Sequence, residues 1–74
     1  MKITVSAGSW ARRYLKSPCE LDLPDGSTVA DALLLLPLPQ QEIGLVAIDG
    51  AAVPRETVLR HGDNLKIYPV IIGG

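Results

Sequence analysis

The segment from Thr28 to Leu36 has the period of a helix, but it is too short to stand alone. Its apolar residues recur at the spacing of one helix face: Val29, Ala32, Leu33 and Leu36. Thr28 is a good N-cap residue, and Asp31 follows three positions later, as in a capping box with Asp in place of Glu. Pro37 disfavours helical geometry at Leu36 and ends the helix after about two turns. Because so short a helix does not persist in water, its leucines must pack on a sheet.

The sheet is predicted from segments that alternate with the period of a strand. They span residues 2–6, 19–23, 45–49 and 65–70, with Ala52-Val53 as a short return strand after the Asp49-Gly50 turn. The expected inward residues include Ile3, Val5, Leu65 and Ile67, with Leu59 as a further core anchor. This order predicts an α+β fold. Its mixed sheet has four to five strands, with the first and last strands adjacent in the middle and one helix on one face.

Composition narrows the class of protein. A chain of 74 residues, with 47% hydrophobic and 20% charged residues, is typical of one small globular domain. A net charge of −1 lacks the basic excess of a nucleic-acid binder. No segment approaches the ~18–20 apolar residues of a membrane helix, and the start lacks the apolar stretch of a signal peptide. With Cys19 as its single cysteine, the chain is expected in the reducing cytoplasm.

The last residues are unusual for a chain end, because an apolar run leads into two glycines. Pro69 lacks a backbone donor, so the sheet should end near it. We therefore expect a folded domain over residues 1–69 and a flexible tail over residues 70–74. Val70, Ile71 and Ile72 favour extended backbone, whereas Gly73 and Gly74 present no Cβ to a surrounding wall.

Three stretches, taken in order, resemble the ubiquitin-like β-grasp sulfur carriers. They are DGSTVADALLLL, VAIDGAAVPRETVLRHGD and the tail IYPVIIGG, and together the resemblance covers the whole chain. The family includes the small subunit of molybdopterin synthase and the thiazole-pathway sulfur carrier of thiamine synthesis. The resemblance implies a β-grasp fold and a reactive carboxylate on Gly74. In the family this carboxylate is adenylated and then converted to a thiocarboxylate, the sulfur donor.

The resemblance also implies partners. They are an ATP-dependent activating enzyme, a sulfur source such as a cysteine desulfurase or rhodanese, and either the large subunit of molybdopterin synthase or thiazole synthase. No bound cofactor is expected, since ATP is used by the activating enzyme. The chain is expected to be a cosubstrate rather than an enzyme, because its sequence offers no nucleophile, base or metal-ligand set. Lys66, Tyr68 and Pro69 are the expected partner contacts, with Val70, Ile71, Ile72 and Gly73 threading the partner's channel.

The pathway and the fate of Gly74 stay open at this point. The long connection from Gly8 to Pro18 and the Tyr68-Pro69 pair favour molybdenum or tungsten pterin synthesis. The molybdopterin-synthase small subunits usually have phenylalanine and a double proline here, whereas this chain has no phenylalanine and a single proline, and its ending VIIGG is closer to the thiazole carriers. A protein modifier joined to lysines through Gly74 needs the same activation. A β-grasp binding module with incidental glycines is a further alternative.

Other residues carry weaker signals. Cys19 lies on the apolar face of a strand pattern, which favours a core role over sulfur chemistry. His61 is expected to be a solvated turn residue. The basic cluster of Arg12, Arg13 and Lys16 is either a solvated loop, with Trp10 covering the core, or a contact for an acidic partner or a phosphate. Leu33 to Leu36 cannot all face the sheet, so Leu34 or Leu35 is expected at the surface.

Overall fold

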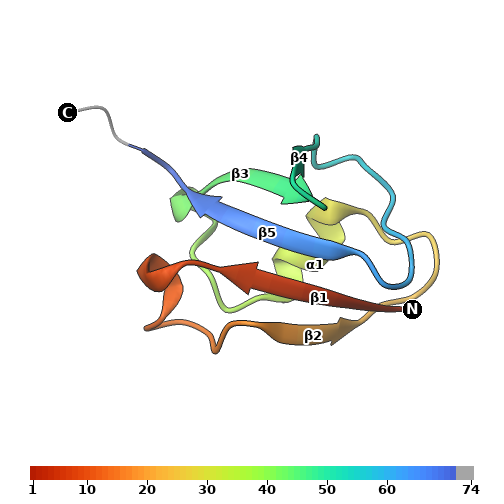
Figure 1. The fold of residues 1–74 in the computed structure, drawn as a ribbon, viewed down its shortest axis with the longest axis horizontal. Coiled ribbons are helices and arrows are strands. Elements are labelled where there is room, and N and C mark those ends of the chain that lie inside the picture. Colours follow the sequence, from red (N-terminus) through yellow and green to blue (C-terminus); the bar gives the residue numbers. More distant parts are fainter. Residues whose placement is uncertain (72–74) are drawn as a thin grey trace.

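The computed structural model describes residues 1–71. It consists of a twisted sheet with one helix across one of its faces (Figure 1). In chain order its elements are β1 (Lys2–Ala7), η1 (Ser9–Ala11), β2 (Cys19–Asp22), α1 (Val29–Leu35), η2 (Gln40–Glu42), β3 (Ile43–Ile48), β4 (Ala51–Ala52) and β5 (Asn64–Pro69). The two η elements are single 3₁₀ turns. This order agrees with the predicted succession of strands around a single helix.

The five strands lie in the order β2-β1-β5-β3-β4. The first and last strands, β1 and β5, are parallel neighbours in the middle, and Val5 pairs with Leu65. Every other pair of neighbouring strands is antiparallel. The predicted α+β arrangement is therefore confirmed, with the chain's two ends contributing its central strands.

The core lies between α1 and the inner face of the sheet. Its largest fully buried side chains come from β1, α1 and β5: Ile3, Val5, Val29, Leu33, Leu65 and Ile67. Leu59 is 3% exposed, as predicted for an anchor in an irregular segment. Leu38 is buried too, although its place in a proline-rich loop gave no period from which to predict this. Burial of these side chains is the main favourable term for a chain this small.

The start of α1 is held by the predicted capping box. The backbone N–H of Thr28 donates to Asp31 Oδ2 at 2.9 Å, and the N–H of Asp31 donates to Thr28 Oγ1 at 3.2 Å. The helix ends at Leu35, because Leu36 before the proline is extended, with ψ of 143°. Within residues 1–71 no helix has the length and apolarity needed to cross a membrane.

The edge of the sheet departs from the predicted strand limits. β3 begins at Ile43 instead of residue 45, and the return strand is Ala51–Ala52 instead of Ala52-Val53. Ile43 pairs with Pro69 and Val46 pairs with Ile67, so two residues of β3 lie opposite one residue of β5. This β-bulge breaks the strict alternation from which strand limits are predicted.

Gly44 allows the bulge to lie against the end of β5. A Cβ built on Gly44 would stand 2.6 Å from the carbonyl oxygen of Pro69 and 2.9 Å from the backbone nitrogen of Val70. Both atoms belong to the backbone, which cannot rotate away as a side chain does. Glycine is therefore required here by the close approach of two backbones.

We predict that Thr28→Ala lowers the free energy of unfolding by about 1 kcal/mol, because the N–H of Asp31 loses its acceptor. Thr28→Ser keeps the hydroxyl and is the matched control, expected to unfold within a few tenths of a kcal/mol of the wild type. Equilibrium denaturation in urea measures both. Equal midpoints for the alanine and serine variants would show that the hydroxyl adds nothing to stability.

We predict that Gly44→Ala destabilises the fold by about 1–3 kcal/mol, the usual cost of forcing an extra carbon into a packed site. Leu45→Ala, at the neighbouring bulge position, is the control, because the Leu45 side chain is 52% exposed. Denaturation midpoints compare the two. If Gly44→Ala is as stable as the wild type, the backbones of β3 and β5 do not approach as closely as described.

Candidate functional site

The outward face of β5 presents the two side chains that the sequence predicts for partner contact. Lys66 and Tyr68 both point away from the helix, and Lys66 Nζ lies 5.3 Å from the centre of the Tyr68 ring. Tyr68 is 38% exposed, so part of its ring packs on the protein and part is free. A half-exposed aromatic ring with a cation beside it is typical of protein interfaces.

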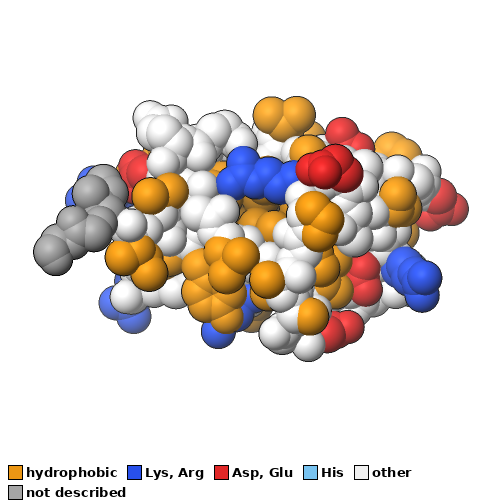
Figure 2. Space-filling model, turned by 90° about the horizontal axis from the view of Figure 1, so that it is seen from above, with side chains coloured by type: hydrophobic (Ala, Val, Ile, Leu, Met, Phe, Trp, Pro, Cys, Tyr) orange, Lys and Arg blue, Asp and Glu red, His pale blue; other side chains and the backbone are white. Residues whose placement is uncertain are grey.

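Leu45 extends this face, although the sequence analysis does not single it out. The bulge places Gly44 and Leu45 opposite Tyr68, and the Leu45 side chain is 52% exposed. In a regular strand, every second residue faces solvent. The bulge adds one residue to β3, so that the apolar Leu45 is also exposed on this side. Gly44 is the sequence signal that could have revealed the irregularity, since glycine inside a strand pattern often marks a bulge. In the view of Figure 2, several hydrophobic side chains are exposed between the tail and the middle of the molecule.

The root of the tail is tied to the turn before β3. Pro69 pairs with Ile43, and the Val70 N–H donates to the carbonyl of Glu42 at 3.0 Å. The Glu42 carboxylate in turn accepts a hydrogen bond of 2.9 Å from the Tyr14 hydroxyl. Val70 is therefore still attached by its backbone, one residue beyond the predicted limit of the folded domain.

Arg55 holds the bulge from the other side. One guanidinium nitrogen donates to the carbonyl oxygens of Ile43 at 3.1 Å and Gly44 at 3.2 Å. These carbonyls belong to the segment that contacts Pro69 and Val70. Arg55 was not a predicted site residue, and a single arginine in an irregular segment offers no sequence signal of this role. It fixes the bulge against which the end of β5 rests.

Beyond this tether the chain presents apolar side chains to solvent. Val70 is 45% exposed and Ile71 is 88% exposed. Both were predicted to belong to an extended tail that a partner grips. The predicted roles of Ile72, Gly73 and Gly74, including the Gly74 carboxylate, lie outside the described residues and stay predictions, as does the flexibility of residues 70–74.

Cys19 and His61 serve structure. Cys19 is partly buried against the core, and burial raises the pKa of its thiol above the ordinary value. A raised pKa leaves less of the nucleophilic thiolate, which fits the predicted packing role. His61 does more than a solvated turn residue, because its Nδ1 accepts a hydrogen bond of 3.0 Å from the Lys2 N–H. It ties the last turn to the start of β1.

The remaining predicted surface features divide between packing and exposure. Trp10 packs against the core, as expected of a covering side chain. Arg13 is exposed, with its guanidinium carbon 6.0 Å from the centre of the Tyr14 ring. Arg12 and Lys16 line a hollow beside the end of β1. On α1, Leu33 is buried, whereas Leu34 and Leu35 are 73% and 60% exposed.

Solved structures share this fold. The chain is similar to the crystal structure of SAMP1 from Haloferax volcanii, with a TM-score of 0.79 and 20% sequence identity over 100% of both chains. A second crystal structure, of H. volcanii small archaeal modifier protein 1, has a TM-score of 0.78 and 19% identity over 95% of this chain and 98% of that chain. The sequence matches no curated protein at a significant level. The predicted ubiquitin-like β-grasp is thereby confirmed as the fold.

The sequence itself matches a family model. Residues 12–72, which include the helix, the β3–β4 hairpin and all of β5, match the model described as Mut7-C ubiquitin. This range also holds the bulge, the outward residues Lys66 and Tyr68 and the tether at Val70. The family is ubiquitin-like, as the resemblance to β-grasp carriers predicted. Because the match spans most of the chain, the protein belongs to the Mut7-C ubiquitin family.

Proposed function

We propose that this protein is a sulfur carrier whose Gly74 carboxylate is adenylated and converted to a thiocarboxylate. It acts as a cosubstrate and binds no cofactor of its own, since ATP is consumed by the activating enzyme. The working compartment is the reducing cytoplasm, where thiols and persulfides persist. The proposal requires Gly74 to carry the free carboxylate, which the intact mass of the purified protein checks directly.

The supporting observation is the way the last strand leaves the sheet. β5 is central and buried on its inner face, yet it continues past Pro69 into Val70 and the exposed Ile71. From there the sequence has only Ile72 before two glycines. Residues 70–74, when extended, reach roughly 17 Å, which is long enough to enter a partner's active site while the domain stays outside. Exposed β-branched side chains lose little freedom when such a tail is gripped.

The chemistry explains why activation is needed. A carboxylate has no leaving group, so a carboxylate oxygen of Gly74 must first attack the α-phosphorus of ATP and release pyrophosphate. Hydrosulfide then attacks the carbonyl carbon of the acyl-adenylate and releases AMP and a proton, leaving the thiocarboxylate. If the sulfur comes instead from a protein persulfide, the acyl disulfide formed is reduced by a second thiol, which ends as a disulfide. The carrier supplies only the reacting carboxylate and the tail that brings this carboxylate into the partner's active site.

Molybdopterin synthesis is the proposed destination of the sulfur. The eleven-residue connection between Gly8 and Pro18 and the Tyr68-Pro69 pair before the tail support it. Thiamine thiazole synthesis is the alternative, supported by the ending VIIGG. The expected partners are the activating enzyme, a cysteine desulfurase or rhodanese, and the large subunit of molybdopterin synthase or thiazole synthase. Growth of two tester strains, each lacking one carrier, separates the pathways by which strain is rescued.

A protein modifier is the second candidate function. The similarity to H. volcanii small archaeal modifier protein 1 favours it, since that protein is described as a modifier. A modifier uses the same adenylate, but a lysine amine attacks the carbonyl carbon in place of sulfur. Recovery of tagged protein from cells, followed by a search for IYPVIIGG remnants (residues 67–74, left by trypsin after Lys66) on lysines, tests this. Such remnants on other proteins would support the modifier, and a thiocarboxylate alone would support the carrier.

Deletion of Gly74 is predicted to abolish activation without weakening the fold. Residues this far beyond the core are expected to change stability by no more than ~0.5 kcal/mol. The shortened tail ends roughly 3.5 Å from the proper position, and misplacement by ~1 Å can already cost about a hundredfold in rate. Pyrophosphate exchange with the cognate activating enzyme measures the loss, and intact mass after sulfur transfer shows one oxygen replaced by one sulfur only in the wild type.

Adding one alanine after Gly74 is the companion variant, because it keeps every native residue and displaces only the carboxylate. It is expected to fail in exchange as the deletion does. Equal exchange by the wild type, the deletion and the extension would mean that the tail is not the reactive element, and the carrier proposal would be abandoned.

Tyr68→Asp is predicted to weaken binding to the activating enzyme at least tenfold, because it places a charge on an apolar contact. Melting should change little, since the ring is already partly exposed. Leu34→Asp is the matched control: it introduces the same charge at a 73% exposed leucine on the helix face. Titration calorimetry with the activating enzyme compares them. Weaker binding by Leu34→Asp alone would move the docking surface to the helix face.

A further inference from the structure

Charge is distributed unevenly along this chain, and its basic part is one loop. Of the seven basic and eight acidic side chains, the eleven residues from Gly8 to Pro18 hold three basic ones and no acidic one. The other 63 residues therefore carry four basic and eight acidic side chains. A loop of one sign on a domain of the opposite sign attracts anions to that place in particular. The loop connects β1 to β2 and includes the 3₁₀ turn η1.

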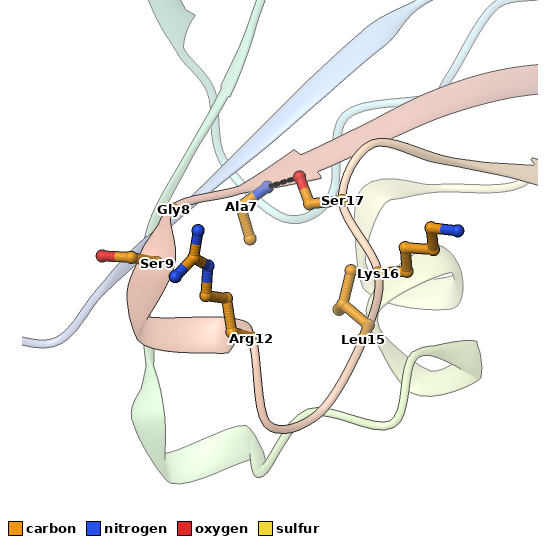
Figure 3. A pocket seen from close by; sticks show the side chains of 7 residues that line it. All are labelled: Ala7, Gly8, Ser9, Arg12, Leu15, Lys16 and Ser17. Carbon is orange, nitrogen blue, oxygen red and sulfur yellow. Dashed lines mark hydrogen bonds between the residues drawn. The ribbon is translucent and has the colours of Figure 1, made fainter.

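The loop borders an open hollow with a volume of about 480 Å³. Its walls are Ala7, Gly8, Ser9, Arg12, Leu15, Lys16 and Ser17. Figure 3 shows the guanidinium of Arg12 reaching from η1 towards the backbone at Gly8, with Ser17 on the opposite wall. Ser17 Oγ accepts a hydrogen bond of 3.0 Å from the Ala7 N–H, so its own proton is available to a ligand. The Lys16 ammonium points outward from the rim and adds charge from there.

In the described part of the chain, no carboxylate lies within 4 Å of the Arg12 guanidinium or the Lys16 ammonium. Within residues 1–71, the ion pair within 4 Å joins the Met1 amino group to Asp25 and involves neither Arg12 nor Lys16. The Glu42 carboxylate accepts a hydrogen bond from the Tyr14 hydroxyl of this loop, but neither residue lines the hollow. A guanidinium presents several donors in a planar fork that matches the oxygens of phosphate or carboxylate.

We infer that this hollow binds the phosphoryl group of a small phosphate monoester. A phosphate monoester carries close to two negative charges at neutral pH and several acceptor oxygens, which suits the Arg12 guanidinium and the Ser17 hydroxyl as donors, with the outward Lys16 ammonium adding only positive charge from the rim. A single carboxylate offers less charge to the same set. The volume exceeds what a phosphate alone requires and falls within the range of small-molecule sites. Ala7 and Leu15 supply apolar wall for the remainder of the ligand.

The protein contains its own reporter for this binding. Trp10 is the single tryptophan, and its Cδ1 would lie 3.3 Å from a Cβ on Gly8, one of the lining residues. A ligand that settles against Gly8 therefore changes the surroundings of the indole. Tryptophan fluorescence and backbone amide shifts can both follow binding in the free carrier, without an activating enzyme.

The test titrates the full chain with inorganic phosphate, AMP and acetate at constant ionic strength, since added salt screens exposed charges. AMP is expected to saturate with millimolar affinity, to bind more tightly than inorganic phosphate and to shift amides of residues 7–17. Acetate is expected to bind at least tenfold more weakly than phosphate. Acetate binding equal to phosphate binding would overturn the phosphoryl assignment, and the absence of saturable shifts with all three would overturn the site.

Two matched variants distinguish a specific binding site in the hollow from nonspecific attraction of anions to a basic loop. Arg12→Gln and Arg13→Gln remove the same charge from the same loop, but Arg13 does not line the hollow and lies beside the Tyr14 ring. Arg12→Gln should weaken AMP binding at least tenfold, and Arg13→Gln by less than threefold. Equal losses would mean that only the loop's net charge attracts the anion. Both side chains are exposed, so circular dichroism is expected to show a retained fold. Phosphate binding in the hollow does not involve Gly74, so the titration can exclude the phosphate site without excluding the carrier function, and the reverse also holds.

Discussion

The parallel pairing of β1 with β5 is the constraint on which the rest of this structure depends. It joins the beginning of the chain to its end, with Val5 beside Leu65 in the centre of the sheet. The strands β2 and β3 then add on either side, and α1 covers the inner face of the sheet. Parallel neighbours run in the same direction, so the loop after β1 and the chain beyond β5 leave at the same end of the sheet (Figure 1). The basic hollow and the end of β5 lie at the same end of the sheet for this reason.

A central strand that continues past its sheet requires control of its direction. Here the control comes from close backbone contacts and hydrogen bonds at the edge of the bulge, one set of them made by the Arg55 side chain, rather than from packing of apolar side chains. The Val70 N–H is bonded to Glu42, Gly44 lies against Pro69, and Arg55 binds the bulge carbonyls. Backbone contacts of this kind are stiff, since they leave no rotamer to relax. The described part of the tail therefore starts from a defined point, although Ile71 itself is almost fully exposed.

Residues in the core and residues on the surface of this domain have different roles. Three residues that could carry chemistry have structural roles within residues 1–71: Cys19 packs against the core, His61 accepts a hydrogen bond from the backbone, and Trp10 covers the core. Most of the large exposed apolar residues lie on the outward face and tail, at Leu45, Tyr68, Val70 and Ile71, or on the helix at Leu34 and Leu35, and Val58 is exposed in the segment before β5. Exposed apolar area on so small a domain is typical of interaction surfaces.

The amino-acid sequence by itself determined the elements governed by local rules. The helix with its Thr28 cap, the stop at Pro37, the Asp49-Gly50 turn and the inward residues of β1 and β5 all follow from short-range sterics, hydrogen bonding and periodicity. Tertiary structure alone decided the bulge at Gly44, the bond between Arg55 and the bulge and the burial of Leu38. Each of these depends on contacts between groups from different segments of the chain, and a local sequence pattern does not predict such contacts.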